Sequence, residues 1–174
     1  MPGRFATLGI SLIVDYEVVM VPFRCVPMDT AAADRFRETG VDDAGNRLHR
    51  KLADHPAPCR HCLTDAVQGE PVLLGSYHFG RPKGIYWTPS PIFVHEQRCT
   101  PFRPANLIPE IVRNRLVSVR AYDSDDFCVY DLGDVSEGGN VEVLIDRALA
   151  DRPTDYVTIH TARPGCFLCR AERI

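Results

Sequence analysis

Six short segments of this chain alternate apolar and polar residues with a period of two, which is the pattern of half-buried β-strands. They span residues 70–77, 92–95, 116–122, 127–132, 156–161 and 166–172. The turn-forming residues 123–126 and 162–165 separate two pairs of these segments, so both pairs predict antiparallel hairpins. Strands joined in this way do not form βαβ units. The sequence therefore predicts an α+β fold with a mainly antiparallel sheet.

Two helices are expected among these strands. A short amphipathic stretch over residues 31–39 follows a capping Asp29 and ends at Gly40, a residue that commonly terminates helices. Apolar residues recur at helical spacing over residues 141–149. We expect each helix to pack one face on the core.

Residues 82–109 form the least regular part of the sequence. They carry six of the fourteen prolines and the only tryptophan, Trp87. Proline disfavours central strands and long helices, so we expect a long Pro-rich and aromatic-rich loop. Ordered loops of this length often serve a function. The alternative is that the aromatic rings cover the open face of the sheet.

Composition limits the class of protein. A chain of 174 residues with 45% hydrophobic residues is expected to form one domain, and its apolar runs are all shorter than the ~20 residues of a membrane span. A net charge of −3 gives no broad attraction to nucleic acid or to anionic membranes, so neither partner is expected. The seven cysteines are too few for a small disulfide scaffold and favour a reducing, cytoplasmic location.

The N-terminus carries an apolar run over residues 8–14 that Asp15 and Glu17 follow at once. A secretory signal has a longer apolar core and a small-residue cleavage site. We therefore expect residues 1–19 to be an N-terminal extension outside the native domain. Translation from Met20 would give a single α+β domain over residues 20–174.

Two C-x-x-C pairs, Cys59/Cys62 and Cys166/Cys169, match the usual number and spacing of ligands in a four-cysteine zinc site. Two features argue against that site. Neither pair has a glycine that would help the backbone turn between the thiols. The second pair lies on a predicted strand, where positions i and i+3 face opposite sides of the sheet, so we expect Cys166 and Cys169 to be small buried residues.

The first pair is the better candidate for chemistry. Arg60 and His61 stand between its cysteines, and positive neighbours lower the pKa of a thiol. His95 is the last residue of a predicted strand and Cys99 lies four residues later, so the two are able to complete a metal site with this pair. The alternatives are structural loop cysteines and a histidine that only donates a structural hydrogen bond.

His160 lies on the more polar face of its predicted strand, next to the turn that carries Arg163. An imidazole and a guanidinium in this position suit an anion-binding corner, and the alternative is a solvated sheet face. Asp123, Asp125 and Asp126 lack the ligand order of a calcium loop and predict a hairpin turn.

Several short motifs occur in one order along the chain. They are Phe23-Arg24-Cys25, Pro58-Cys59-Arg60, Asp65-Ala66, Gly69-Glu70, Ile92-Phe93-Val94, residues 116–123, and Ala162-Arg163-Pro164-Gly165-Cys166 running into Arg170. With these motifs, residues 22–173 resemble a bacterial family known as domain of unknown function twelve-hundred-three. The resemblance implies a small bacterial cytosolic protein and brings no activity. It also implies cysteine at Cys59 and Cys166, with Cys62 and Cys169 as local features, which weakens the zinc and dithiol interpretations.

These residues fit both a binding protein and an enzyme, so two hypotheses stand. The preferred one is a protein that binds a small anionic or planar ligand, or a protein partner, without a cofactor. Its site residues are Cys59, Arg60, Trp87, His95, His160 and Arg163. The alternative is a thiol- or zinc-dependent enzyme or metalloprotein, with His61 or His95 as base or ligand. Its metal ligands are Cys59, Cys62, His95 and Cys99.

Overall fold

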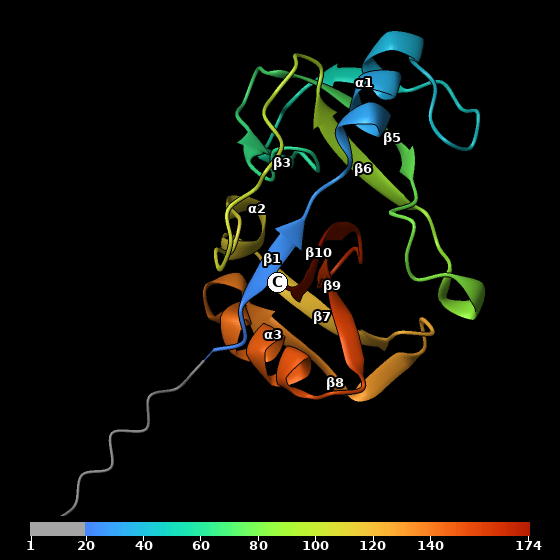
Figure 1. The fold of residues 1–174 in the computed structure, drawn as a ribbon. Helices are drawn as coiled ribbons and strands as arrows, with labels where there is room; N and C mark the ends of the chain where they lie inside the picture. The colour runs from blue at the N-terminus through green and yellow to red at the C-terminus, as the bar shows by residue number, and fades with distance from the viewer. Residues whose placement is uncertain (1–19) are drawn as a thin grey trace, which may run out of the picture.

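The computed structural model describes residues 20–174, which fold around two antiparallel sheets (Figure 1). The larger sheet has five strands in the order β1-β10-β9-β7-β8. These are β1 (Phe23–Val26), β7 (Leu116–Asp123), β8 (Cys128–Glu137), β9 (Thr154–Thr161) and β10 (Phe167–Arg173). The predicted α+β class with mainly antiparallel pairing is confirmed, with two principal sheets in place of the one expected.

The smaller sheet has three strands in the order β2-β5-β6. They are β2 (His49–Leu52), β5 (Pro71–Tyr77) and β6 (Ser90–His95), and a two-stranded ribbon of β3 (Ala57–Pro58) and β4 (Asp65–Ala66) lies beside them. Strand β6 confirms the strand predicted over residues 92–95 and begins two residues earlier, inside the Pro-rich stretch. Its Pro91 is tolerated because β6 is an edge strand, where a missing N–H breaks no ladder.

The three α-helices are α1 (Thr30–Thr39), α2 (Glu110–Arg113) and α3 (Val141–Ala150), with short 3₁₀ turns η1 (Gly84–Tyr86) and η2 (Gly138–Asn140). The two predicted helices, α1 and α3, are confirmed. In α1 the Asp29 carboxylate accepts a hydrogen bond from the N–H of Ala32 at 2.8 Å, and Gly40 ends the helix with φ 65°. Helix α1 packs on the three-stranded sheet through its buried Phe36.

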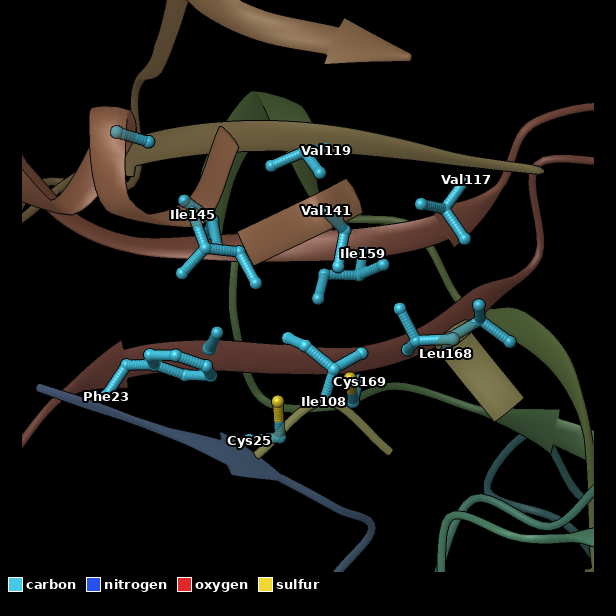
Figure 2. Close-up of a cluster of buried hydrophobic side chains, with 14 of the residues drawn as sticks. Phe23, Cys25, Ile108, Val117, Val119, Val141, Ile145, Ile159, Leu168 and Cys169 are labelled. Atoms are coloured by element: carbon cyan, nitrogen blue, oxygen red, sulfur yellow. The ribbon is translucent and has the colours of Figure 1, made fainter. Parts of the chain in front are cut away.

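Helix α3 covers one face of the five-stranded sheet and forms the main core (Figure 2). Val141 and Ile145 of the helix are fully buried against the sheet, whose Val117, Val119 and Ile159 point towards them. Burial of each such side chain contributes roughly 1.5–3 kcal/mol to stability. This layer therefore anchors β7 and β9, the central strands of the sheet.

The opposite face of this sheet is also buried. Tyr156, Thr158 and His160 of β9 are at most 6% exposed, and the arm between β5 and β6 (residues 78–89) reaches over them towards the β7–β8 hairpin (Figure 1). The more polar face of 156–160 is thus packed rather than solvated. Polar side chains of β9, including Thr158 and His160, are therefore buried inside the molecule.

Some elements were not predicted. Strand β2 has the sequence His-Arg-Lys-Leu, with no buried side chain, and the four-residue α2 is too short to show a period. The N-terminal extension that we expected over residues 1–19 lies outside the described residues. Within residues 20–174, no helix has both the length and the apolar character needed to cross a bilayer.

Candidate metal centre and aromatic cleft

A tight turn between β3 and β4 presents the first C-x-x-C pair. The N–H of Cys59 donates to the Thr64 carbonyl at 3.0 Å, and the N–H of Leu63 donates to the Cys59 carbonyl at 3.0 Å. Leu63 adopts φ 56°, the left-handed conformation that we expected to need a glycine. Its side chain is fully buried in the main core, which holds this conformation in place. The turn therefore forms without glycine, contrary to our expectation.

The turn lies directly against β6. Cys59 and Phe93 form a parallel β-bridge, and the N–H of Arg60 donates to the Phe93 carbonyl at 2.9 Å. His95 at the end of β6 and Cys99 in the following segment thus come to lie beside the turn.

Four side chains converge at this place: Cys59, Cys62, His95 and Cys99. Their ligand atoms all lie within 4.8 Å of one another. The Sγ atoms of Cys59 and Cys99 are 3.9 Å apart, and His95 Nδ1 is 3.4 Å from Cys62 Sγ. These are the four residues that the sequence suggested as a metal site, and the structure brings them together.

Each sulfur of this cluster also has a hydrogen-bond partner that is not one of the four ligand atoms. The backbone N–H of His95 donates to Cys59 Sγ at 3.4 Å, and the Thr64 hydroxyl lies 3.1 Å from Cys62 Sγ. Arg37 Nη2 donates to Cys99 Sγ at 3.5 Å. Donors of this kind stabilise thiolate sulfur, which is the form that binds metal.

The two histidines near the cluster have different positions. His95 directs Nδ1 to the cluster, while its Nε2 lies 3.6 Å from a carboxylate oxygen of Glu70. A carboxylate behind the distal nitrogen is the usual support of a metal-binding histidine. His61 instead places Nδ1 3.2 Å from Cys99 Sγ and Nε2 3.0 Å from the Thr30 hydroxyl. His95 is therefore the ligand candidate, and His61 supports Cys99.

The contacts within the cluster change the acidity of its members. Hydrogen bonds from Cys62 and Cys99 hold the pKa of Cys59 well below its ordinary value. Its hydrogen bonds to Cys59 and Cys62 raise the pKa of His95 to about 10. The same two sulfurs raise the pKa of Cys99. The two shifts act in the same direction and favour a thiolate at Cys59 beside a protonated His95.

A shallow pocket of about 270 Å³ opens onto the cluster from the side of Glu70, His95 and Cys99. Of the four cluster residues, His95 and Cys99 line this pocket. Cys59, at 0% exposure, lies beneath the other ligands and does not face solvent.

Arg60 leaves the same turn in the opposite direction. Its side chain is 2% exposed, and it donates to the Phe167 carbonyl at 2.8 Å and to the Pro58 carbonyl at 2.5 Å. Burial lowers the pKa of Arg60 to about 10, so the guanidinium stays charged at neutral pH. Arg60 thereby links the turn between β3 and β4, which we call the metal-site turn, to β10.

A second candidate site, the aromatic cleft, lies on the other side of Phe167. It has a volume of about 210 Å³ between the arm and the five-stranded sheet. Its walls include four aromatic rings, two guanidinium groups and one imidazole, from Phe79, Tyr86, Tyr122, Phe167, Arg81, Arg120 and His160. Arg120 was not predicted as a site residue, although it occupies a polar position in the alternating strand 116–122.

The residues of the preferred ligand site are distributed over both places. Only His160 lines the cleft. Trp87 lies outside it, 55% exposed, with its ring 5.0 Å from that of His78. Arg163 is exposed in the β9–β10 turn and does not line the cleft either. Cys59 and His95 belong to the cluster, and Arg60 lies between the two sites.

The second C-x-x-C pair is divided between two environments. Cys166 precedes β10 and lines the cleft. Cys169 is fully buried and points into the main core with Cys25 (Figure 2). A shared ion between Cys166 and Cys169 is thus incompatible with their surroundings.

No curated protein and no solved structure matches the chain. A family model described as a protein of unknown function, DUF1203, matches residues 56–173, which is more than half of the chain and includes both candidate sites. The chain therefore belongs to the DUF1203 family.

Proposed function

We propose that this protein binds one zinc ion through Cys59, Cys62, His95 and Cys99, and that the ion holds the smaller sheet and the metal-site turn together. The observation that carries the proposal is the convergence of the four ligand atoms within 4.8 Å, from the turn, the end of β6 and the segment after it. Residues brought together from separate segments in this way are typical of structural metal centres.

The ligand types favour zinc over other common ions. Thiolate and imidazole ligands suit zinc, whereas calcium and magnesium bind carboxylate and carbonyl oxygens. Three cysteines and one histidine are a regular set for a tetrahedral structural site. The Glu70 carboxylate behind His95 and the donors around the sulfurs supply the outer support that such sites have.

Charge balance supports the same assignment. A zinc ion with three thiolates carries a net charge of −1, and Arg37 donates directly to Cys99 Sγ. The buried guanidinium of Arg60 begins in the same turn and has only carbonyl acceptors among the described residues. A nearby anionic centre lowers the cost of burying such a cation.

A structural role fits better than a thiol nucleophile. Four protein ligands fill a tetrahedral ion and leave no open position for a substrate. Cys59, the residue with the most strongly lowered thiol pKa, is completely buried and does not reach a substrate. A cytoplasmic location belongs to this proposal, because free thiols and thiolate zinc sites persist in reducing compartments.

Elemental analysis of the full chain purified from zinc-containing medium tests the proposal. We expect about one zinc per chain, as in other structural sites. Cys62→Ser and Cys99→Ser should lose the metal, whereas Cys128→Ser, a half-buried cysteine of β8 outside the cluster, should retain it. Replacement of the ion by cobalt should give the absorption of tetrahedral thiolate ligation.

Two results would overturn the proposal. One is protein that contains no metal and does not take up zinc at neutral pH under reducing conditions. The other is iron with acid-labile sulfide in place of zinc, which would make the cluster an iron–sulfur site. A metal-free protein with one thiol that reacts rapidly at pH 6 would favour the thiol enzyme instead.

A further inference from the structure

We propose that the aromatic cleft binds a small planar carboxylate, held by its ring between aromatic side chains and by its acid group on Arg120. This inference is separate from the proposed zinc site, since the cleft residues are not the metal ligands. It rests on the cleft's walls, on the charge of one side chain and on the way the arm is fastened.

The walls of the cleft are flat and apolar. Tyr122 projects from β7, Phe167 from the start of β10, and Phe79 and Tyr86 from the arm. Phe79 stacks on Phe167 with ring centres 3.9 Å apart, and Tyr86 meets Tyr122 edge-on at 5.9 Å. Flat apolar walls of this kind select a planar ligand.

Arg120 supplies the charge of the cleft. Arg120 is half-buried, and within residues 20–174 no carboxylate forms an ion pair with it. A guanidinium matches the two oxygens of a carboxylate in a bidentate pair. An arginine that lines a cleft without such a partner is therefore well suited to bind an anion.

The other basic side chains of the cleft are already engaged. Arg81 pairs with Asp126 at 2.7 Å and with Asp155 at 2.6 Å. His160 lies 3.1 Å from the Gly165 carbonyl through Nδ1 and 2.9 Å from the Thr158 hydroxyl through Nε2. Burial lowers the pKa of His160 to about 4, so the ring is neutral at pH 7. Arg120 is thus the cleft's free cationic group among the described residues.

The cleft is also preformed. Besides the two ion pairs of Arg81, the arm is held by a contact of 3.0 Å between the hydroxyls of Tyr86 and Tyr130 and by the Lys83 N–H, which donates to Asp126 at 3.0 Å. A fixed wall reduces the entropy lost on binding. The volume of about 210 Å³ lies below the range of roughly 300–1,000 Å³ for drug-sized ligands, so we expect a single ring.

Calorimetric titration of the full chain, with its purified metal content, tests this inference. The probes are nicotinate and benzoate, and the matched controls are nicotinamide and benzamide, which keep the ring and lose the charge. We expect saturable binding of at least one acid and about tenfold to hundredfold weaker binding of its amide, since a charged hydrogen bond is lost.

Two arginine variants separate the cleft from general surface charge. Arg120→Gln should weaken binding of the acid by about tenfold or more. Arg163→Gln, an exposed arginine outside the cleft, should leave it unchanged. Arg120→Lys keeps the charge and loses the planar fork, and circular dichroism checks that each variant is folded.

The inference is overturned if neither acid binds at millimolar concentration, if acid and amide bind equally, or if folded Arg120→Gln and Arg120→Lys both bind as the parent does. Failure here leaves the zinc proposal intact, because metal content is measured separately. Loss of zinc from a Cys99→Ser variant, conversely, does not count as evidence about the cleft.

Discussion

The metal cluster and the aromatic cleft are built in opposite ways. The cluster gathers four ligand atoms within 4.8 Å, three of them sulfurs from short segments with recognisable spacing. The cleft is made from the arm and from strands β6, β7, β9 and β10, with one arginine that forms no ion pair among the described residues. A site of rare residue types at close spacing leaves a trace in the sequence. A site made by packing two surfaces does not.

The largest effect should follow the loss of one ligand of the metal cluster, compared with the loss of a cysteine outside both sites. Cys59→Ser removes a metal ligand that is completely buried, and we expect a loss of about 4 kcal/mol in the free energy of unfolding. Cys128→Ser should change it by less than about 1 kcal/mol. Urea unfolding followed by circular dichroism measures both. Equal midpoints for the two variants would show that the cluster does not stabilise the fold.

The cleft side should respond to pH through His160. Its pKa is about 4 in the folded protein against a usual value of 6.5, because burial and the charges of Arg120 and Arg60 outweigh its hydrogen bond to Gly165. The unfolded chain then binds the proton more tightly. The neutral His160 ring therefore contributes to the free energy of unfolding. This contribution is fully present above pH 6.5, and about 3 kcal/mol of it is lost as the pH falls to 4.

Comparison of the parent with His160→Asn isolates this effect, since the other titrating groups are common to both. The parent should lose more stability than His160→Asn between pH 7 and pH 4, as measured by urea unfolding. His49→Asn, at an exposed position of β2, should follow the parent. Parallel curves for the parent and His160→Asn would contradict the prediction.

Replacement of a residue that contacts a metal ligand should weaken the metal site less than replacement of the ligand itself. Glu70→Gln removes the carboxylate near His95 Nε2, and we expect zinc affinity to fall about tenfold to hundredfold. Glu96→Gln is the matched control, because Glu96 follows His95 directly and pairs with Arg50 instead. Competition with a chromogenic chelator measures both affinities. Identical values would show that Glu70 does not support the centre.

The smallest effect is expected for the residue that the sequence made most conspicuous. Trp87 is 55% exposed and lies outside the cleft, so Trp87→Ala should change stability by less than about 1 kcal/mol. Nicotinate and benzoate should bind this variant as they bind the parent. A loss of affinity as large as that of Arg120→Gln would extend the ligand site to Trp87.

Much of the fold was predictable because it depends on local patterns. Helix α3, the hairpin turns and the strands around them follow from hydrophobic period and turn residues. Strand β2 was not predicted because its pairing with β5 makes it a strand, while its own side chains show no alternation. Strand β2 therefore forms because it pairs with β5, and its own sequence pattern does not show it.

The candidate sites divide along the same line. The grouping of Cys59, Cys62, His95 and Cys99 was suggested by residue type and spacing, although the missing glycine argued against a turn. That objection fails because the core holds Leu63 in its left-handed conformation. Arg120 and Tyr122 were not predicted as site residues, since nothing local shows that the arm covers their face of the sheet.

Arg60 connects the metal cluster with the aromatic cleft. Its backbone belongs to the metal-site turn, and its guanidinium holds the carbonyl of Phe167, a wall of the cleft. Movement of the turn would therefore be transmitted to this wall of the cleft through the Arg60 hydrogen bond. Linkage is reciprocal, so a ligand that favours one position of Phe167 would change the affinity for the metal by the same factor as the metal changes the affinity for that ligand.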